Sequence, residues 1–523
     1  MPTYLSPGVY VEEVSSGSRP IEAVGTAVAA FVGFAEKGPV DEPTLITNWT
    51  QYTRTFGGFV AGSFLPLSVY GYFLNGGGSA YVVRVGGAGG AGADSADDAA
   101  AGESYAAAAV PAAGDNGRLS FTVRAALPGP AGQDLSVEVT DASEGGDDAF
   151  KLVVKQAGKP VETLDNLTTK RGAGNVVTAV RQQSKLIQIE EAKGATLAPP
   201  RRGAEITLAT PALPATTTGT GDLRVRAEDY VGDVSDRTGF AGLEAIEDIT
   251  MLCVPDLAAA HQQGAIDDEA FKAVQLAMIA HCELMGDRVA ILDPPPGLHP
   301  QRLKEWRMDV AGYDSKYATL YWPWVKVMDP AQGRAVFMPP SGHVAGVWAR
   351  NDDTRGVHKA PANEIIRGAL ALESGLTKGE HDQLNPIGVN CIRAFPGQGI
   401  RIWGARTLSS DAEWRYLNVR RLFNWIEKSI LLGTNWVVFE PNDPRLWDAV
   451  RRVITMFLRR VWRSGALMGD TWSEAFFVKC DAENNPPENL DAGILTVDIG
   501  IAPVKPAEFV VFRLSQLSQG SGD

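Results

Sequence analysis

The sequence has few of the residues that disulfide, metal or redox sites require. Its 523 residues include only four cysteines, Cys253, Cys282, Cys391 and Cys480, which are widely spaced and never form a C-x-x-C pair. This spacing argues against a disulfide framework and a zinc site, and it fits a protein made in a reducing compartment. There are six histidines, and the one beside a cysteine, His281, lies in an apolar helical pattern that favours core packing.

Motifs for nucleotide binding and hydrolysis are missing as well. The sequence has no G-x-x-x-x-G-K-[ST] loop, no H-E-x-x-H and no G-x-S-x-G, and residues 397–399 (G-Q-G) lack the third glycine of a dinucleotide-binding turn. Ser341 and His343 lie two residues apart with no positioned acid, so we interpret residues 339–343 (P-P-S-G-H) as a turn. We therefore expect no catalytic residue, no metal and no cofactor.

The charge and the apolar runs exclude further classes of protein. Lys and Arg number 48 against 62 Asp and Glu, which gives a net charge of −14 and argues against general coating of nucleic acid. The apolar stretch 23–35 is too short for a membrane span, and residues 1–4 lack the basic start of a secretory signal. We expect a protein with no nucleic-acid partner and no direct membrane insertion.

The composition divides the chain. At roughly 150 residues per domain, 523 residues suggest three or four domains. Residues 86–117 are largely Ala, Gly, Asp and Ser, and short alternating segments follow at 119–123, 135–139 and 150–154. Such spacing is typical of a small, mostly β domain. We predict an inserted surface domain at residues 86–235.

The remainder alternates between strand and helix patterns. Strands are expected at 27–34, 81–85, 249–254, 289–293 and 318–327, and helices at 67–74, 270–285 and 300–309. This order predicts an α+β multi-domain chain with a central α/β domain. The expected parts are an N-terminal arm at 1–20, the N-terminal part of the core at 21–85, the central domain at 236–400 and a C-terminal α+β domain at 401–523.

Two helices are expected in the C-terminal domain. Ser410 and Glu413 have the spacing of a capping box before the first helix, which should end near Gly433. The second helix, at 444–464, should pack through one face that contains Val450, Val453, Ile454, Phe457 and Val461. At about 100° per residue, four arginines fall within about 40° on the opposite side: Arg445, Arg452, Arg459 and Arg463. This stripe is either a solvated face with mixed ion pairs or a binding face for an acidic surface.

Both ends of the chain contain isolated groups of strand-forming residues. The N-terminal group is Val9, Tyr10, Val11, Glu12 and Val14, cut off by a Ser/Gly spacer, and the C-terminal group is Phe509, Val510, Val511, Phe512 and Leu514. Such strands either fold back onto their own domain or add to the sheet edge of another chain. A further alternating segment is Leu495, Val497, Ile499 and Ile501.

Several segments, taken in their order along the chain, resemble contractile tail sheath proteins. They are residues 4–13 (Y-L-S-P-G-V-Y-V-E-E), 26–33 (T-A-V-A-A-F-V-G), 339–347 (P-P-S-G-H-V-A-G-V), 359–363 (K-A-P-A-N), 385–390 (N-P-I-G-V-N) and 403–408 (W-G-A-R-T-L). Each segment is weak alone, but the ordered set is specific and covers the chain outside 86–235.

The resemblance implies a subtilisin-like central domain that is not proteolytic. It also implies a structural subunit that stacks as six-subunit rings around an inner tube and contracts without ATP. Its partners would be further copies of itself, the inner tube protein, the baseplate and a tail terminator or cap protein. The particle would assemble in the bacterial cytoplasm, and it would either stay there or be released as a phage tail or an extracellular injection particle.

The same resemblance gives the isolated segments a function. The two terminal groups would be arms donated to other subunits, Leu495–Ile501 would belong to the acceptor sheet, and the arginine stripe would face an acidic tube wall. The rival interpretation is a cryptic hydrolase built on the central domain.

Overall fold

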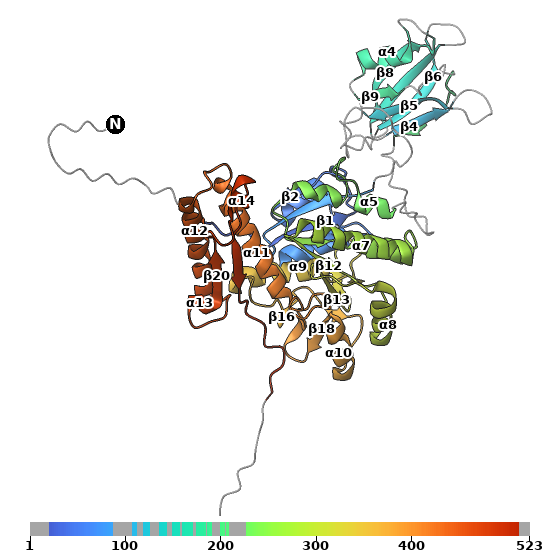
Figure 1. Cartoon of the computed structure of the whole chain (residues 1–523). Helices are drawn as coiled ribbons and strands as arrows, with labels where there is room; N and C mark the ends of the chain where they lie inside the picture. The colour runs from blue at the N-terminus through green and yellow to red at the C-terminus, as the bar shows by residue number, and fades with distance from the viewer. Residues whose placement is uncertain are drawn as a thin grey trace, which may run out of the picture. The chain divides into compact units, whose positions relative to one another are not determined.

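The computed structural model describes residues 20–86, 107–111, 119–125, 135–143, 149–156, 159–170, 174–184, 186–190, 199–203, 205–208 and 226–511. The chain forms two compact units (Figure 1). The first contains residues up to Gly86 together with Leu223 onward, and the second is Gly87–Asp222.

A nine-stranded sheet organises the first unit, in the order β16-β19-β18-β13-β12-β11-β1-β3-β2. Six strands run parallel in its middle: β18 (Val389–Phe395), β13 (Ala318–Trp322), β12 (Val289–Leu292), β11 (Met251–Cys253), β1 (Val28–Gly33) and β3 (Ser79–Arg84). Antiparallel strands form the edges: β2 (Thr44–Ile46), β19 (Gly399–Ile402) and β16 (Glu364–Ile365).

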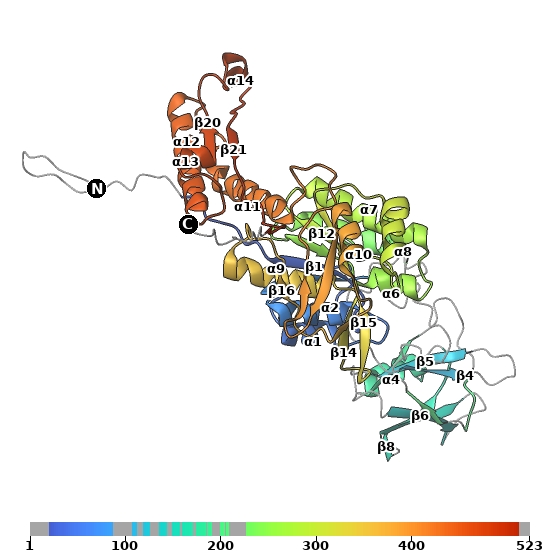
Figure 2. The ribbon, with the colours of Figure 1, turned by 90° about the horizontal axis from the view of Figure 1, so that it is seen from below.

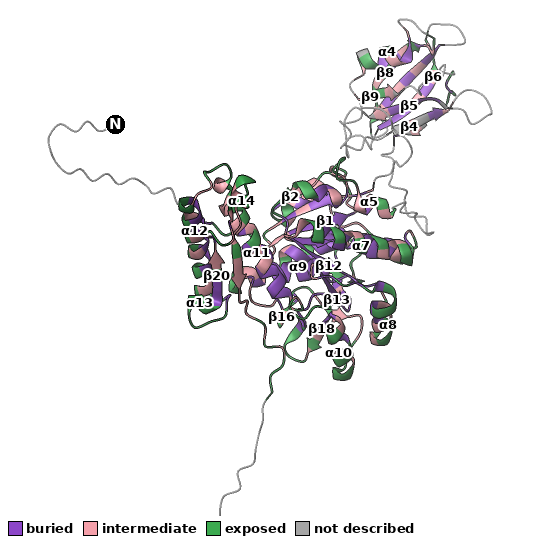
Figure 3. Ribbon diagram, in the orientation of Figure 1, coloured by how far each residue is buried: buried purple, intermediate pink, exposed green. Residues whose placement is uncertain are grey.

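Helices cover both faces of this sheet. Ala30 and Leu252 point to a core shared with α5 (Ala227–Val231), α6 (Asp256–Gln262) and α7 (Asp268–Met285). Phe31 and Met251, their neighbours in sequence, point to the other core, with α1 (Trp49–Phe56), α2 (Leu65–Asn75) and α9 (Ser341–Arg355). Because both faces are buried (Figure 3), the strands are continuous apolar runs, which explains why several could be predicted.

The remaining elements of the central part lie around this three-layer body. They are the helical turn η1 (Ala241–Ala245), α8 (Pro300–Glu305), the π-helical η2 (Trp306–Ala311), α10 (Lys378–Leu384) and the turn η3 (Asn385–Ile387). A separate three-stranded sheet has the order β15-β14-β17, made by β15 (Arg334–Met338), β14 (Val325–Asp329) and β17 (Ala371–Leu372).

Two expectations for the central part are wrong. The strand predicted at 318–327 is two strands, because β13 ends at Trp322 and Pro323, which has no N–H for a sheet ladder, separates it from β14. The turn predicted at 339–343 is the start of a helix. Pro340 caps α9, since proline is tolerated where a helix begins, and Ser341 is the first helical residue.

The C-terminal part consists of α11 (Leu417–Gly433), the turn η4 (Asn435–Val437), α12 (Pro444–Arg463), α13 (Trp472–Ala475), β20 (Phe476–Lys479), α14 (Pro487–Asp491) and β21 (Asp498–Ile501). Figure 2 shows these elements gathered at one end of the first unit. The apolar face predicted for α12 is confirmed, since its five residues are at most 4% exposed and share one core: Val450, Val453, Ile454, Phe457 and Val461.

The capping box predicted before the first of these helices is wrong. α11 begins after Tyr416, which makes no side-chain cap. Ser410 instead hydrogen-bonds to Asp314, with its amide 2.9 Å from Oδ1 and its hydroxyl 2.5 Å from Oδ2. A tertiary contact has therefore taken the hydroxyl that local spacing assigned to a cap.

Three of the expected boundaries shift. The inserted range ends before 235, because Tyr230 of α5 is buried in the core of the first unit. A boundary at 401 cuts through β19. Ile21, expected in the N-terminal part of the core, is 1% exposed and packs within the C-terminal core.

The described residues of the second unit form a small β structure that also contains the helix α4. It has a four-stranded sheet, β10-β6-β7-β8, and a three-stranded sheet, β4-β5-β9. The bounds are β4 (Ala107–Pro111), β5 (Leu119–Ala125), β6 (Leu135–Asp141), β7 (Phe150–Gln156), β8 (Lys159–Leu167), α4 (Val176–Gln183), β9 (Ile187–Glu190) and β10 (Glu205–Thr207). Its buried apolar residues, which include Val137 and Leu152, form a core of their own.

Candidate functional site: the assembly surfaces

The two-stranded sheet β20–β21 is the first candidate surface. The strands pair antiparallel, with Val478 opposite Ile499 and Phe476 opposite Ile501. In the described part of the chain no third strand joins this sheet. Two-stranded sheets are marginal alone and have unpaired edges, so β20–β21 can accept a further strand.

Half of the predicted acceptor segment is not strand. Ile499 and Ile501 lie in β21, whereas Leu495 and Val497 precede it and pack against the C-terminal core. The Asn485 side chain holds this preceding segment: its Oδ1 accepts the Thr496 amide at 2.7 Å and its Nδ2 donates to the Thr496 carbonyl at 3.0 Å. An asparagine side chain thus occupies the backbone groups that a neighbouring strand would need.

The described part of the C-terminal arm is exposed. Phe509, Val510 and Val511 are 74%, 69% and 77% exposed and belong to no strand of their own subunit. The other predicted arm residues lie outside the described residues: Val9, Tyr10, Val11, Glu12, Val14, Phe512 and Leu514. Three adjacent apolar side chains without cover mark an interaction segment.

The chain that follows the N-terminal arm is fixed on α11 and α12. The Val24 carbonyl accepts a hydrogen bond from Trp425 Nε1 at 2.9 Å, and the Val24 amide donates to Ser429 Oγ at 3.3 Å. The Arg460 guanidinium donates to the Ile21 carbonyl. An arm that begins here therefore leaves from a rigid helical surface.

The outer face of α12 is the second candidate surface. All four arginines of the predicted stripe are exposed: Arg445, Arg452, Arg459 and Arg463. Among the described residues none of the four has an ion-pair partner, and Asp448, the nearby acid, pairs with Arg451. The Arg459 guanidinium lies over the Trp472 ring at 4.5 Å. The stripe is thus a row of cations for which the described residues supply no ion-pair partner.

A buried ion pair joins the central and C-terminal parts. Arg421 of α11 and Asp352 of α9 are 2.5 Å apart, and their side chains are 4% and 2% exposed. The same guanidinium stacks on Trp348 at 4.7 Å and donates to the Thr26 carbonyl at 3.1 Å. No sequence motif pointed to this pair, because its members are 69 positions apart and belong to different patterns. The pair ties the central part to the C-terminal part within the first unit.

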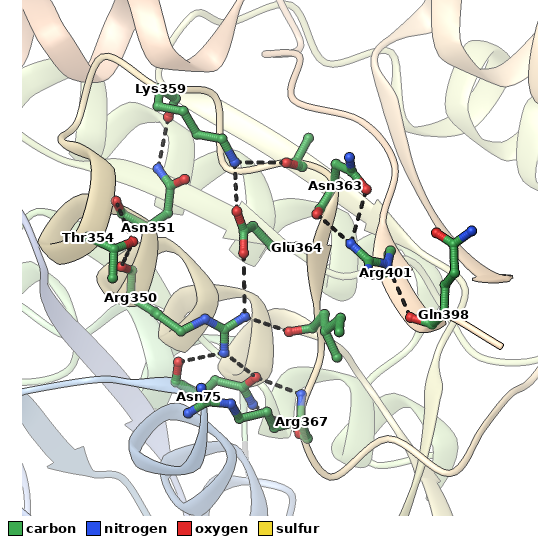
Figure 4. A network of polar contacts seen from close by, with 12 residues as sticks. Asn75, Arg350, Asn351, Thr354, Lys359, Asn363, Glu364, Arg367, Gln398 and Arg401 are labelled. Atoms are coloured by element: carbon green, nitrogen blue, oxygen red, sulfur yellow. Dashed lines mark hydrogen bonds and ion pairs between the residues drawn. The ribbon is translucent and has the colours of Figure 1, made fainter.

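A polar network holds the segment 359–363 (K-A-P-A-N) in place (Figure 4). Lys359 pairs with Glu364 at 2.7 Å and also donates to the Ala362 carbonyl at 3.0 Å. Arg401 of β19 donates to the Asn363 carbonyl at 3.0 Å. Arg350 of α9 donates to the Asn75 carbonyl at 3.0 Å, which ties α9 to α2. These residues fix a connector rather than form a reaction site.

Ser341 and His343 do not form a hydrolytic site. Both are buried, at 0% and 2% exposure, so no substrate reaches them. The Ser341 amide donates to Asp293 Oδ1 at 3.1 Å, and burial raises the pKa of Asp293 to about 7. The His343 imidazole lies against α2 instead, where a Cβ on Gly71 would be 2.4 Å from it. This arrangement does not favour the hydrolase interpretation.

Neither a metal-binding cluster nor a membrane-crossing helix is found among the described residues. They contain no cluster of three or more His, Cys, Asp or Glu side chains placed to hold a metal ion. None of their helices combines the length and the hydropathy that a bilayer crossing requires.

Comparisons with known proteins place the chain beside sheath proteins. Residues 225–408 match the family model "Phage tail sheath protein central domain", and residues 409–516 match "Phage tail sheath C-terminal domain". The two matches together cover more than half of the chain. The tail sheath protein of Burkholderia phage BcepMu is 25% identical over 543 aligned residues, which cover 98% of this chain and 97% of that protein.

Solved structures have the same fold. The helical sheath of the anti-feeding prophage in its contracted state aligns with a TM-score of 0.58 and 24% identity, over 98% of this chain and 100% of the other. The contracted sheath complex of the extracellular contractile injection system PVC aligns with a TM-score of 0.58 and 22% identity, over 99% of both chains.

Proposed function

Because this chain belongs to the contractile tail sheath family, we propose that it polymerises as stacked six-subunit rings around an inner tube and contracts to drive that tube into a target. The family is structural and its members are components of phage tails or of extracellular injection particles. The baseplate would lie at one end of the polymer and a terminal cap protein at the other.

One observation carries the proposal: an open two-stranded sheet and an unpaired apolar arm are on the same subunit. Phe509–Val511 lacks a partner strand, and β20–β21 lacks neighbouring strands among the described residues. Addition of the arm of one copy to the sheet of another would pair the backbone groups of the arm and of the sheet edge. The backbone hydrogen bonds formed in this way depend little on sequence. Because donor and acceptor are on every copy, such addition continues without limit and builds a polymer.

The proposed contraction is a movement of rigid bodies that remain linked. The Arg421–Asp352 pair holds the central and C-terminal parts together, and the arms would keep neighbouring subunits linked while they rotate. Free energy stored at assembly would drive this movement without ATP, in agreement with the lack of a nucleotide-binding loop in the sequence.

The arginine stripe of α12 is the proposed contact with the tube. Exposed ion pairs contribute about 0.2–1 kcal/mol each, so a repeated set would hold the tube firmly yet release it during contraction. An acidic tube wall is the partner chemistry that fits four exposed arginines with no ion-pair partner among the described residues.

Removal of the N-terminal arm tests the polymerisation mechanism. We expect a protein that lacks residues 1–20 to remain folded, because the described fold starts at residue 20, but not to form stable cylinders. Negative-stain microscopy of full-length and truncated protein at equal concentration measures this. Cylinders of normal length from the truncated protein would show that the arm is not a connecting element.

A further inference from the structure

A single contact precedes the exposed C-terminal arm. The Glu508 carboxylate accepts two hydrogen bonds from Arg406, from Nε at 2.9 Å and from Nη2 at 2.6 Å. It also accepts Asn385 Nδ2 at 2.8 Å and the Tyr416 hydroxyl at 3.3 Å. The residues on either side, Ala507 and Phe509, are exposed. The segment is therefore held at one point, immediately before the arm begins.

The partner of this contact is rigidly attached to the nine-stranded sheet. The Arg406 amide donates to Asn390 Oδ1 at 2.7 Å. The Arg406 carbonyl accepts hydrogen bonds from Asn390 Nδ2 at 2.8 Å and from Thr319 Oγ1 at 2.9 Å. Asn390 is in β18 and Thr319 is in β13, two neighbouring strands of the parallel part. A force applied at Glu508 thus reaches the middle of the sheet.

The pair is shielded from water. The Arg406 side chain is 9% exposed and that of Glu508 is 19% exposed. Burial alone would raise the pKa of Glu508, but hydrogen bonds from Arg406 and Asn385 hold this pKa below its usual value. Charge-assisted, two-point contacts of this kind are stronger and better directed than neutral ones.

The chain crosses from the C-terminal part to the central part just before this contact. Residues 502–504 are still attached to the C-terminal part, through the Ala502 amide to the Ala475 carbonyl at 2.9 Å and the Val504 amide to the Ala466 carbonyl at 3.2 Å. Residues 505–507 then cross to the central part, where Glu508 binds. Figure 1 shows this terminal segment leaving the C-terminal helices toward the sheet. The arm therefore starts from the central part although the preceding strand belongs to the C-terminal part.

We propose that Glu508 is a positioning residue that fixes the exit point of the C-terminal arm, so that tension from a neighbouring copy is transmitted to the nine-stranded sheet and bypasses β20–β21. This inference rests on the proposed function, because the arm must bind a second copy of this chain. Releasing Glu508 frees residues 505–508. At about 3.3–3.6 Å per residue, these four residues add at most roughly 13–14 Å of slack to each connection.

The first test examines the isolated full-length subunit and does not depend on polymerisation. All four native cysteines are buried, so spin labels can be placed selectively on Ala507→Cys and on Leu284→Cys, an exposed position of α7. We expect a narrow distance distribution between the labels in this background. Adding Glu508→Gln should broaden it severalfold, whereas adding Lys505→Ala, an exposed change in the same crossing, should not. A narrow distribution with Glu508→Gln would overturn the proposal.

The second test examines the assembled sheath. Glu508→Gln with an unchanged melting temperature should lower the yield of cylinders at least threefold and spread their axial repeat in cryo-electron microscopy, and Lys505→Ala should match the wild type. If Glu508→Gln gave the wild-type yield and axial repeat, the proposed transmission of tension through Glu508 would be overturned. If the wild type itself formed no cylinders, the proposed function would fail, and the spin-label distances would still decide whether Glu508 fixes the arm.

Discussion

At the contact between α2 and α9, the side chain of His343 is fully enclosed. It is 2% exposed, and its Nδ1 has no hydrogen-bond partner within the described residues. Burial lowers the pKa of this imidazole from 6.5 to about 4, so it is neutral in the folded subunit near pH 7. The sequence suggested a turn here because prolines and glycine dominate locally, and nothing local indicated that α2 would cover the helix.

The burial of His343 predicts a pH dependence of stability. Between pH 6.5 and pH 4 the unfolded chain binds a proton that the folded chain does not, so the free energy of unfolding falls as the pH falls through this window. The contribution of His343 is complete above pH 6.5, and its loss by pH 4 is on the order of 3 kcal/mol.

Denaturant unfolding at several pH values measures this contribution. His343→Gln should lower the stability at pH 7 and flatten the slope between pH 7 and pH 4. His299→Gln, an exposed histidine at the start of α8, is the control and should retain the wild-type slope. An unchanged slope with His343→Gln would contradict the argument.

Among the elements, α12 shows most clearly how one helix serves two surfaces. Its apolar residues recur every three or four positions and build the C-terminal core, which leaves the arginines on the opposite side. Packing on one side therefore fixes the direction of the cations on the other. Asp443 caps the helix by accepting the amides of Arg445 and Leu446, so the whole stripe is carried on an ordered element.

Reversal of the stripe's charge should abolish assembly around the tube. We expect Arg452→Glu, Arg459→Glu and Arg463→Glu together to leave the subunit folded, because all three side chains are exposed, and to prevent tube-filled particles. The control is Arg334→Glu, an exposed arginine of β15 in the central part. The measurement is the yield of tube-filled particles at low and high salt, and normal yield with the triple variant would refute the tube contact.

For the whole molecule, the sequence predicted what local patterns determine. The buried parallel strands, α2, α7 and α12 follow from apolar runs and helical periodicity, and the strands of the second unit follow from alternation between turns. It could not predict contacts between distant segments, such as Arg421 with Asp352 or Glu508 with Arg406, because these depend on the tertiary arrangement. For the same reason, only half of the predicted acceptor segment is a strand. The Asn485 side chain, rather than a neighbouring strand, accepts the hydrogen bond of the Thr496 amide.

The second unit offers a test of modularity. It has its own core, in which residues such as Val154 are fully buried, and it is bounded in the chain by Gly86 and Leu223 of the first unit. Replacing residues 87–222 by a short Gly/Ser linker should leave a soluble protein that forms cylinders, with the melting temperature of the first unit unchanged. Calorimetry and microscopy check this, and aggregation of the shortened protein would mean that the second unit covers apolar surface.

The most direct measurement of the central claim is a cryo-electron microscopy reconstruction of the polymerised protein. The account predicts that β20–β21 of each subunit is extended by strands from other subunits, one from residues 9–14 and one from residues 509–514. It further predicts that Glu508 remains bound to Arg406 of its own chain. A polymer in which both terminal segments pair within their own subunit, with β20–β21 left two-stranded, would contradict it.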